Sequence, residues 1–348
     1  MIEIKAKLVK KIDNSYRIFI DKQAIKSLPE FLKENKLGKK YAIITDLRTL
    51  KLIGKNLSAH LKKNGIENHL ISFEPGEKSK SLSTLEDLSN EMVEKGYTRK
   101  DAIICLGGGV VGDIGGFLAS VYMRGIPYIQ IPTTLLAMVD SAIGGKTGVD
   151  LVNGKNLVGT TTQPKAVFID TDYLKTLPEN QIRSGLSEII KYGVIKDPKL
   201  FKFIEQNLDK IFALEEKSIN YIIKASVQIK TSIIEKDEME SGLRMILNYG
   251  HTYGHALEKL SNYTLLHGYA ISIGMVIANE IAVKKRLLKK SEAERIKKLF
   301  IETGLPVTTM RKPTLKDIAS DKKREGNFIN LILPTRIGSA IIHKEKCQ

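Results

Sequence analysis

One stretch, from Ile103 to Met123, restricts the possible folds more than any other, because it is almost entirely apolar or glycine. A transmembrane helix is one interpretation of such a stretch. It contains Asp113 and six glycines, however, which are poor lipid-facing helix residues. A buried strand, a glycine turn and a helix explain the pattern better. We therefore predict a buried strand-turn-helix unit and no interaction with a membrane.

The first half of the chain alternates between short apolar runs and segments with helical spacing. Apolar residues three and four apart predict helices at 47–64 and 81–95. Strand and helix in alternation are typical of a doubly wound, mainly parallel sheet with helices on both faces. The predicted strands are 41–45, 68–73, 102–106, 128–131 and 166–169.

The pattern changes after about residue 175, where helical spacing of apolar residues begins to dominate. We therefore predict an α/β domain over residues 1–175 and an all-α domain over residues 176–348. A cleft between two such domains is the expected place for a site. The predicted helices of the second half are 182–195, 201–212, 219–234 and 269–288.

The charge balance allows three kinds of partner. Lys and Arg number 55 and Asp and Glu 39, which gives a net charge of +16 and fits an anionic substrate, a nucleic acid or a lysine-rich surface. Residues 284–324 are rich in Lys and Arg but hold a single aromatic residue, Phe300. This composition fits solvent-facing helices, so we predict no nucleic-acid binding.

The two cysteines, Cys105 and Cys347, are too few for a disulfide framework or a cysteine-built zinc site. The first residues alternate between apolar and polar, so we expect no signal peptide. Together these features favour a reducing, cytoplasmic setting.

The glycine turn Gly107-Gly108-Gly109 follows the buried strand and precedes a helix. Glycines let the backbone approach a pyrophosphate, whose charge then faces the amides at the helix N-terminus. No acid follows about twenty residues later, where a ribose ligand is usual. We therefore expect Asp46 or Glu77 to take that role. For Asp113, which closes the motif, an N-cap in a tight structural turn is the competing interpretation.

A second glycine-rich segment runs from Pro132 to Gly148. Its residues 144–147 match part of a P-loop, but Asp140 stands where the first P-loop glycine would be, so a nucleoside triphosphatase is not expected. Lysines and amide donors on a glycine-rich backbone suit a phosphorylated ligand. Lys146, Lys155 and Asn156 are therefore candidate phosphate ligands.

The second half contains a candidate metal site. Glu188 precedes Lys191 by three residues on one helix face. Glu188 and two histidines would supply three ligands and leave a position open for substrate, as in a catalytic zinc site. Four polar residues follow one another at steps of four, three and four, which would place them in one stripe on one side of a helix. They are Arg244, Asn248, His251 and His255, and His267 follows soon after them.

The spacing does not say which two of these histidines bind a metal. His251 and His255 could chelate together, or either could act as a general acid or base. Hydrogen-bonded core histidines would explain one of the three, but hardly all of them beside Arg244 and Asn248.

Taken together, the motifs resemble those of the 3-dehydroquinate synthases, within the wider group of sugar-phosphate cyclases. The matching blocks run in order over about residues 46–323, nearly the whole chain. They are PGEKSKS from Pro75, GGGVVGD from Gly107, YMRG to Gly125, PTTLLAMVDSAIGGKTG from Pro132, GKN from Gly154, GLSEIIK from Gly185, KDEMESG from Lys236, LNYGHTYGHALE from Leu247, LHG from Leu266 and DKK from Asp321.

This resemblance implies a role for each matching residue. The implied ligands of Zn²⁺, or of Co²⁺ in its place, are Glu188, His251 and His267. The implied NAD contacts are Asp46, Glu77, Lys80, Gly109, Val110, Val111, Gly112, Asp113, Thr133, Thr134, Lys146 and Lys155. The implied substrate contacts are Arg124, Lys146, Asn156, Lys230, Arg244, Asn248, His255 and one of Lys322 and Lys323. The implied catalytic residues are Asp140, Lys146, Lys191, Asn248 and His255. Because Arg124 in the family reaches the neighbouring subunit's site, a homodimer is also implied.

The implied reaction converts 3-deoxy-D-arabino-heptulosonate 7-phosphate to 3-dehydroquinate and phosphate, within the shikimate pathway to the aromatic amino acids. It proceeds by transient oxidation with NAD, phosphate elimination, re-reduction, ring opening and aldol closure. Arg244 and Lys230 suit the carboxylate of such a phosphorylated sugar acid.

Two alternatives stay open. Another sugar-phosphate cyclase is possible because Tyr269 stands where many relatives have glutamate and Asp150 replaces a common asparagine. A metal-dependent alcohol dehydrogenase of the same fold would also pair NAD with an open metal site. It would have little use for Lys146, Arg244 and Lys230 gathered together.

Overall fold

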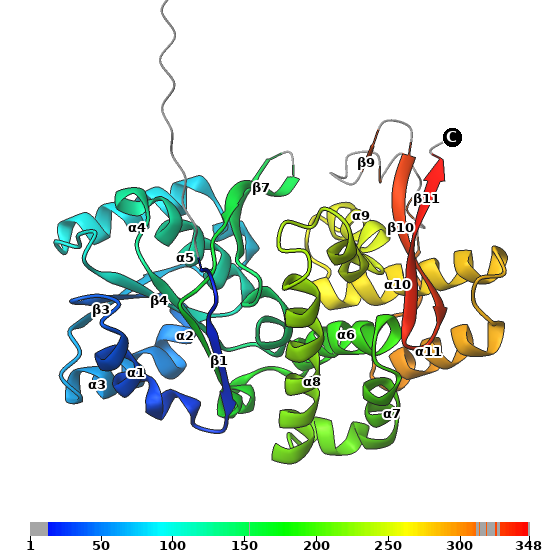
Figure 1. Ribbon diagram of the computed structural model, residues 1–348, viewed down its shortest axis with the longest axis horizontal. Coiled ribbons are helices and arrows are strands. Elements are labelled where there is room, and N and C mark those ends of the chain that lie inside the picture. The colour runs from blue at the N-terminus through cyan, green and yellow to red at the C-terminus, as the bar shows by residue number, and fades with distance from the viewer. Residues whose placement is uncertain are drawn as a thin grey trace, which may run out of the picture.

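The first half of the chain folds around a six-stranded parallel sheet with the strand order β1-β8-β5-β4-β2-β3 (Figure 1). The computed structural model describes residues 13–152, 154–310, 313, 318, 324–325 and 328–346. The sheet confirms the predicted doubly wound fold. Its strands are β1 (Arg17–Asp21), β2 (Tyr41–Asp46), β3 (Asn68–Phe73), β4 (Ala102–Gly107), β5 (Tyr128–Pro132) and β8 (Ala166–Asp170).

Helices cover both faces of the sheet, which explains why β4 is apolar at every position. Ile103 and Cys105 pack on the face of α4 and α5, while Ile104 and Leu106 pack on the face of α1 and α3. Successive side chains of a strand point to opposite faces, so a strand covered twice has no polar side. The helices of this half are α1 (Leu28–Asn35), α2 (Leu47–Thr49), α3 (Lys55–Lys63), α4 (Leu82–Glu94) and α5 (Gly109–Val121).

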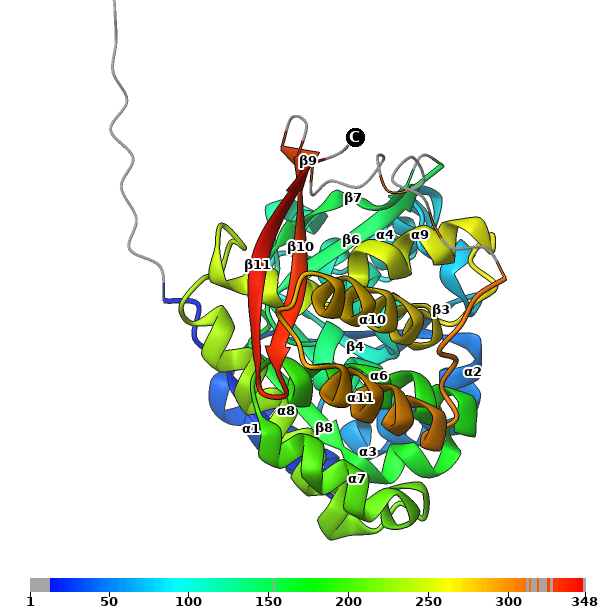
Figure 2. The same ribbon diagram turned by 90° about the vertical axis from the view of Figure 1, so that its right-hand side faces the viewer.

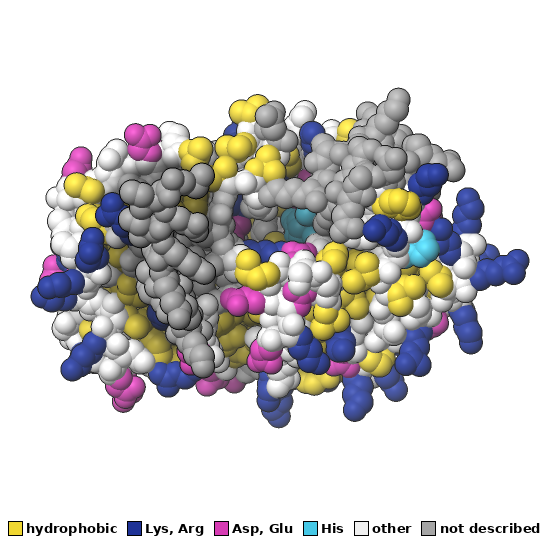
Figure 3. Space-filling model, turned by 45° about the horizontal axis from the view of Figure 1, so that its top comes forward, with side chains coloured by type: hydrophobic (Ala, Val, Ile, Leu, Met, Phe, Trp, Pro, Cys, Tyr) yellow, Lys and Arg dark blue, Asp and Glu magenta, His cyan; other side chains and the backbone are white. Residues whose placement is uncertain are grey.

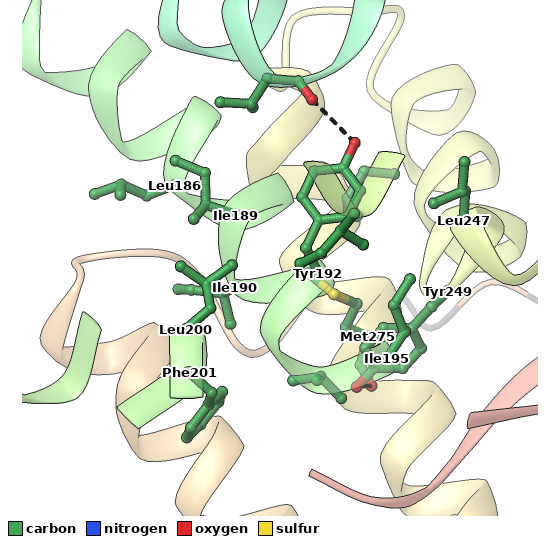
Figure 4. Close-up of a cluster of buried hydrophobic side chains, with 14 of the residues drawn as sticks. Leu186, Ile189, Ile190, Tyr192, Ile195, Leu200, Phe201, Leu247, Tyr249 and Met275 are labelled. Carbon is green, nitrogen blue, oxygen red and sulfur yellow. Dashed lines mark hydrogen bonds between the residues drawn. The ribbon is translucent and has the colours of Figure 1, made fainter. Parts of the chain in front are cut away.

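The second half is predominantly helical, as predicted. Its core includes Leu186, Tyr192, Phe201 and Met275, and Tyr192 Oη donates a hydrogen bond to the backbone oxygen of Val139 at 3.1 Å (Figure 4). Because Val139 belongs to the first half, the two halves share one apolar core at their base. The helices are α6 (Glu179–Ile195), α7 (Pro198–Phe212), α8 (Glu216–Ile234), α9 (His251–Leu260), α10 (His267–Lys284) and α11 (Lys290–Glu302).

The expectation of an all-α second half needs one correction. Strands β10 (Phe328–Arg336) and β11 (Ser339–Lys346) form an antiparallel hairpin that packs against α10, with the short β9 (Arg324–Glu325) beside β10 (Figure 2). Alternation in β10, with Ile329, Leu331 and Leu333 buried, is a strand pattern that the helical interpretation of this half did not take into account.

Two further elements are absent from the predictions. Strand β1 adds to the sheet beside β8. The second glycine-rich segment is not a loop throughout, because β6 (Lys146–Leu151) and β7 (Gly154–Thr161) pair as an antiparallel ribbon. Gly148 and Gly159 face each other there, and a Cβ on Gly159 would lie 2.1 Å from the Thr147 oxygen. These glycines permit close pairing of two short strands.

Among the described residues no helix combines the length and the apolarity that a membrane span requires. The strand-turn-helix unit predicted for residues 103–123 is the one observed, as β4 and α5.

Glycines let α5 lie close to the sheet. A Cβ on Gly115 would come within 2.5 Å of Cys105 Sγ, whereas a Cβ on Gly54, also helical in conformation, would meet its neighbours at 3.4 Å or more. We therefore expect Gly115→Ala to destabilise the protein by about 1–3 kcal/mol relative to Gly54→Ala, since both substitutions gain the same helix propensity. Urea unfolding of the two variants measures the difference, and equal midpoints would contradict it.

Candidate active site

A pocket of about 1370 Å³ lies between the carboxyl ends of the sheet strands and the helices of the second half. Figure 3 shows this hollow between the two halves, with histidine and basic side chains inside it. The pocket brings together most of the residues that the sequence singled out. They are Asp46, Glu77, Lys80, Gly109, Val110, Val111, Asp113, Thr133, Thr134, Asp140, Lys146, Lys155, Asn156, Lys191, Lys230, Arg244, Asn248, His251, His255 and His267.

The glycine turn lies at the carboxyl end of β4. Strand β3 pairs with one side of β2, and β4 pairs with the other side. The direction in which strands are added to the sheet therefore reverses between β2 and β4. Open parallel sheets usually bind ligands at such a point. The first turn of α5 opens towards the pocket there. Asp46, at the end of β2, caps α2 by accepting hydrogen bonds from the amides of Arg48 and Thr49, both at 2.9 Å. Asp46 therefore has a structural role as well as a place in the pocket.

A cluster around the buried Lys80 lies beside the glycine turn. Lys80 Nζ is 2.5 Å from Asp113 Oδ2 and also 2.5 Å from Asn156 Oδ1. Burial raises the pKa of Asp113, and the charge of Lys80 opposes that effect. The N-cap interpretation of Asp113 is wrong, because Asp113 lies inside α5 and Gly108 is the capping residue.

Glu188 and two histidines form the second centre of the site. The Glu188 side chain, on α6, is fully buried, and neither carboxylate oxygen has a hydrogen-bond partner, although Lys191 forms an ion pair with Oε2. The Nε2 atoms of His251 and His267 lie 3.7 and 3.6 Å from Glu188 Oε1. These distances are too long for hydrogen bonds. Ligand atoms about 2.1 Å from a shared tetrahedral ion would be about 3.4 Å apart.

The other nitrogen of each of these imidazoles faces an acceptor. His251 Nδ1 lies 3.2 Å from the Tyr249 backbone oxygen, and His267 Nδ1 lies 3.4 Å from Glu258 Oε2. Because both acceptors lack a proton, each Nδ1 donates, and the Nε2 atoms are the nitrogens that face Glu188. Burial lowers the pKa of His267, but the negative charges of Glu258 and Glu188 outweigh burial and raise it to about 10.

The predicted stripe of Arg244, Asn248, His251 and His255 does not lie on one helix. A short 3-10 turn, Leu243–Asn248, ends before α9 begins at His251, and Gly250 between them has a φ of 81°. A Cβ on Gly250 would lie 2.4 Å from Met275 Cγ, so only glycine fits this break against α10. All four side chains still line the pocket, because the turn and α9 both border it.

The lysines of the pocket are paired with acids. Lys146 contacts Glu240, and Lys155 Nζ lies 3.0 Å from both Glu77 and Glu258. Asn248 Nδ2 donates to Glu240 Oε1 at 2.5 Å. An anionic ligand must therefore compete with Glu240 for Lys146 and Asn248, which are two of the predicted substrate contacts.

Asp140 and Lys230 form a buried pair at 2.5 Å, and Tyr192 Oη donates to the same Asp140 oxygen at 2.8 Å. Burial raises the pKa of Asp140, but Lys230, Lys191 and these hydrogen bonds outweigh burial and hold it well below its usual range. Asp140 is therefore ionised. Arg244, also buried, donates to the Gly144 oxygen at 3.1 Å.

Three predicted residues do not line this pocket. Gly112 is buried in α5 against Gln130, and Glu188 lies beneath the pocket floor. Arg124 is exposed, in a turn with a φ of 68°, and borders Met123, whose exposed fraction is 42%. Lys322 and Lys323 lie outside the described residues.

The sequence analysis assigned no role to Glu240, Glu258 or Tyr192. Glu240 and Glu258 lie within the matching blocks KDEMESG and LNYGHTYGHALE, and Tyr192 follows directly after GLSEIIK. Their position in or next to those blocks was the signal that could have identified them. The contacts of these three residues with Lys146, Lys155 and Asp140 are visible only in the fold.

Comparison with known proteins gives consistent matches. The family model "3-dehydroquinate synthase N-terminal" matches residues 70–184, and "3-dehydroquinate synthase C-terminal" matches residues 185–324. A 3-dehydroquinate synthase of Prochlorococcus marinus subsp. pastoris is 42% identical over 346 residues, covering 97% of this chain and 95% of the relative. That of Thermodesulfovibrio yellowstonii is 44% identical over 338 residues, covering 96% and 94%.

Solved structures agree with this. A 2-epi-5-epi-valiolone synthase from Streptomyces hygroscopicus subsp. jinggangensis, with NAD⁺ and Zn²⁺ bound, has a TM-score of 0.90 at 28% identity and covers 98% of this chain and 95% of its own. A 2-deoxy-scyllo-inosose synthase complexed with carbaglucose-6-phosphate, NAD⁺ and Co²⁺ has a TM-score of 0.84 at 28% identity, with 95% and 94% covered.

A probable glycerol dehydrogenase from Sinorhizobium meliloti is 17% identical, with a TM-score of 0.62 and 87% and 84% of the chains covered, and shares the fold alone. The two family models together span most of the sequence, and the curated relatives match it almost from end to end. This chain belongs to the 3-dehydroquinate synthase family.

Proposed function

We propose that this chain is a 3-dehydroquinate synthase, which converts 3-deoxy-D-arabino-heptulosonate 7-phosphate to 3-dehydroquinate and phosphate. The observation that carries the proposal is one pocket lined by a glycine turn, by basic groups and by two histidines that face the buried Glu188. Identity of 42–44% to curated relatives over nearly the full chain supports the same activity.

The described residues fit a divalent metal ion. Glu188, His251 and His267 offer three ligand atoms within 4.8 Å of one another, and the buried Glu188 oxygens have no hydrogen-bond partner. Burying a carboxylate is costly unless a cation compensates it. Zn²⁺ or Co²⁺ is therefore the proposed occupant. Bound there, the ion polarises the substrate hydroxyl group at the carbon that is oxidised.

The residues around these ligands hold charge in place. Lys191, buried and paired with Glu188, places a positive charge beside that carboxylate and lines the pocket. Asp140, held ionised by Lys230 and Tyr192, offers a fixed acceptor for substrate hydroxyl groups. Fixed charges of this kind need no rearrangement when charge develops in the substrate.

Basic groups line the part of the pocket between the two centres. We assign Arg244 and Lys230 to the substrate carboxylate, and Lys146, Asn156 and His255 to its phosphate. The backbone oxygens of Gly144 and Glu238 accept from the two terminal nitrogens of Arg244, which fixes this positive charge at the wall of the pocket for a substrate carboxylate. When the phosphate binds, it replaces Glu240 as the partner of Lys146.

The nucleotide side of the pocket suits NAD, which supplies hydride transfer when it is bound. The first turn of α5 offers backbone amides to a pyrophosphate, and Gly109 leaves room for its approach. Asp46 and Glu77 lie at the rim as acceptors for ribose hydroxyl groups. We accordingly assign residues 1–175 to NAD and residues 176–348 to metal and substrate.

We further propose a homodimer and a cytoplasmic setting. Arg124 does not line its own pocket and lies in an exposed turn with Val121 and Met123, which suits a residue that completes a neighbouring subunit's site. Cys105 is buried and without a disulfide partner, in keeping with a reducing compartment.

The activity itself is tested by following two products at once. With the heptulosonate phosphate, NAD and Zn²⁺, we expect one phosphate released per substrate consumed and no accumulation of NADH, because the hydride returns in each turnover. NADH accumulation without phosphate would identify an alcohol dehydrogenase instead. A panel of other sugar phosphates serves as the control, and turnover of one of them alone would identify a different cyclase.

Substitution of two neighbouring histidines, one at a time, tests the proposed metal ligands. We expect His251→Ala to bind less than a tenth of the Zn²⁺ of the wild type at equal free metal, because one of three ligands is lost. His255→Ala, one turn away on α9, should keep one Zn²⁺ per chain. Metal analysis of the dialysed proteins measures both. Loss of metal in the second variant and retention in the first would instead assign the ion to the group of His255, Glu258 and His267.

The shared site is tested by mixing two inactive variants. Arg124→Ala lacks the group donated to its neighbour, whereas His255→Ala lacks one in its own pocket. Random mixing makes half the dimers hybrid, and each hybrid has one intact site, so we expect about a quarter of the wild-type activity. Mixed dimers that form and stay inactive would contradict the proposal, as would full activity of Arg124→Ala by itself.

A further inference from the structure

Glu258 is a buried acid that the proposed reaction does not use. It lies on α9, three residues after His255, and only 2% of it is exposed. Its two oxygens have different cationic neighbours. Oε1 is 3.0 Å from Lys155 Nζ, and Oε2 is 3.4 Å from His267 Nδ1. A buried carboxylate placed between two such groups orients both of them.

The contact with His267 orients that imidazole. The carboxylate accepts the Nδ1 proton, which leaves Nε2 as the nitrogen placed to bind an ion, and Nε2 faces Glu188 Oε1 at 3.6 Å. A negatively charged acceptor also makes the imidazole a more basic metal ligand than a neutral acceptor does. His251 differs, because its Nδ1 faces the backbone oxygen of Tyr249. Of these two histidines, His267 is therefore the one whose acceptor is a charged side chain, Glu258, which a mutation can change.

Lys155 holds Glu258 from the opposite side of the pocket. It comes from β7, in the first half, and contacts Glu77 as well as Glu258. Its ammonium group also lies 4.6 Å from the ring centre of Tyr263. Three neighbours hold this lysine, so it anchors the Glu258 carboxylate on the oxygen that His267 does not use.

We propose that Glu258 is a positioning residue for the metal centre, which orients His267 and strengthens its bond to the ion, and that Lys155 acts on the same ion through Glu258. This inference rests on the proposed metal site. The competing arrangement, with Glu258 itself as a ligand beside His255 and His267, is disfavoured because Lys155 already occupies one Glu258 oxygen and the other faces the Nδ1 proton.

The test measures metal affinity directly, without turnover. Metal-free wild type and Glu258→Gln are titrated with Co²⁺ against a chelator, with visible absorption as the readout and no NAD present. Gln keeps the shape of Glu258 and removes its charge, so we expect Co²⁺ to bind about 10–100-fold more weakly, still as one ion per chain. Glu240→Gln is the matched control, since Glu240 pairs with a pocket lysine but contacts no proposed ligand. Its affinity should equal that of the wild type.

Lys155→Met supplies a second measurement. It should weaken Co²⁺ binding in the wild type and have no further effect in Glu258→Gln, because Lys155 acts through the carboxylate. Thermal unfolding of the metal-free variants verifies their folding. If a variant is unstable without metal, the rate of Co²⁺ loss from the loaded protein is compared instead.

The outcomes separate this inference from the proposed function. Wild-type affinity in Glu258→Gln, or additive effects of the two substitutions, would overturn the positioning role while leaving the metal site intact. A second Co²⁺ per chain that disappears in Glu258→Gln would overturn it in favour of Glu258 as a ligand. If the wild type binds no Co²⁺ at all, the proposed metal site itself fails.

Discussion

The carboxylate of Glu188 is fully buried, and its oxygens face two imidazole nitrogens across gaps too long for hydrogen bonds. Burying an unsatisfied charge costs several kcal/mol, about the size of a large mutational effect, so the surroundings must compensate for it. Lys191 supplies a positive charge beside this carboxylate, and the proposed ion would give its oxygens the bonds that they lack. Helices α6, α9 and α10 each bring one of the proposed ligands to the same point.

The close approach of those helices depends on glycine. A Cβ on Gly268 would lie 2.1 Å from the Ser184 oxygen, so α10 and α6 could not pack as they do with a larger residue there. Gly250 serves α9 in the same way against α10. The proposed metal ligands next to these glycines, His267 and His251, are brought towards Glu188 by backbone packing rather than by attraction between side chains alone.

The pocket also shows how a strongly basic chain pairs the lysines inside it. Lys80, Lys155, Lys191 and Lys230 each lie against a carboxylate. This attraction outweighs burial and raises the pKa of Lys80 and Lys155, whereas burial outweighs it and lowers the pKa of Lys230. A pocket built from ion pairs is poised for an anionic substrate, because phosphate or carboxylate can replace an acid that is already in place. Glu240, beside Lys146 and Asn248, is the acid in the position for such an exchange.

The sequence by itself determined five of the six strands of the parallel sheet and most helices, because apolar spacing is a local property that the chain carries along its length. The residues of the pocket followed from the glycine-rich and histidine motifs and from the resemblance that these motifs carry. It could not decide that Arg244 and Asn248 lie on a separate turn from α9, since the break at Gly250 is imposed by contact with α10. The choice of His251 and His267 over His255 followed from resemblance, not from spacing. The pairing of Glu258 with Lys155 and His267 joins three distant elements, and only the tertiary structure, which sets the distances between such elements, decided it.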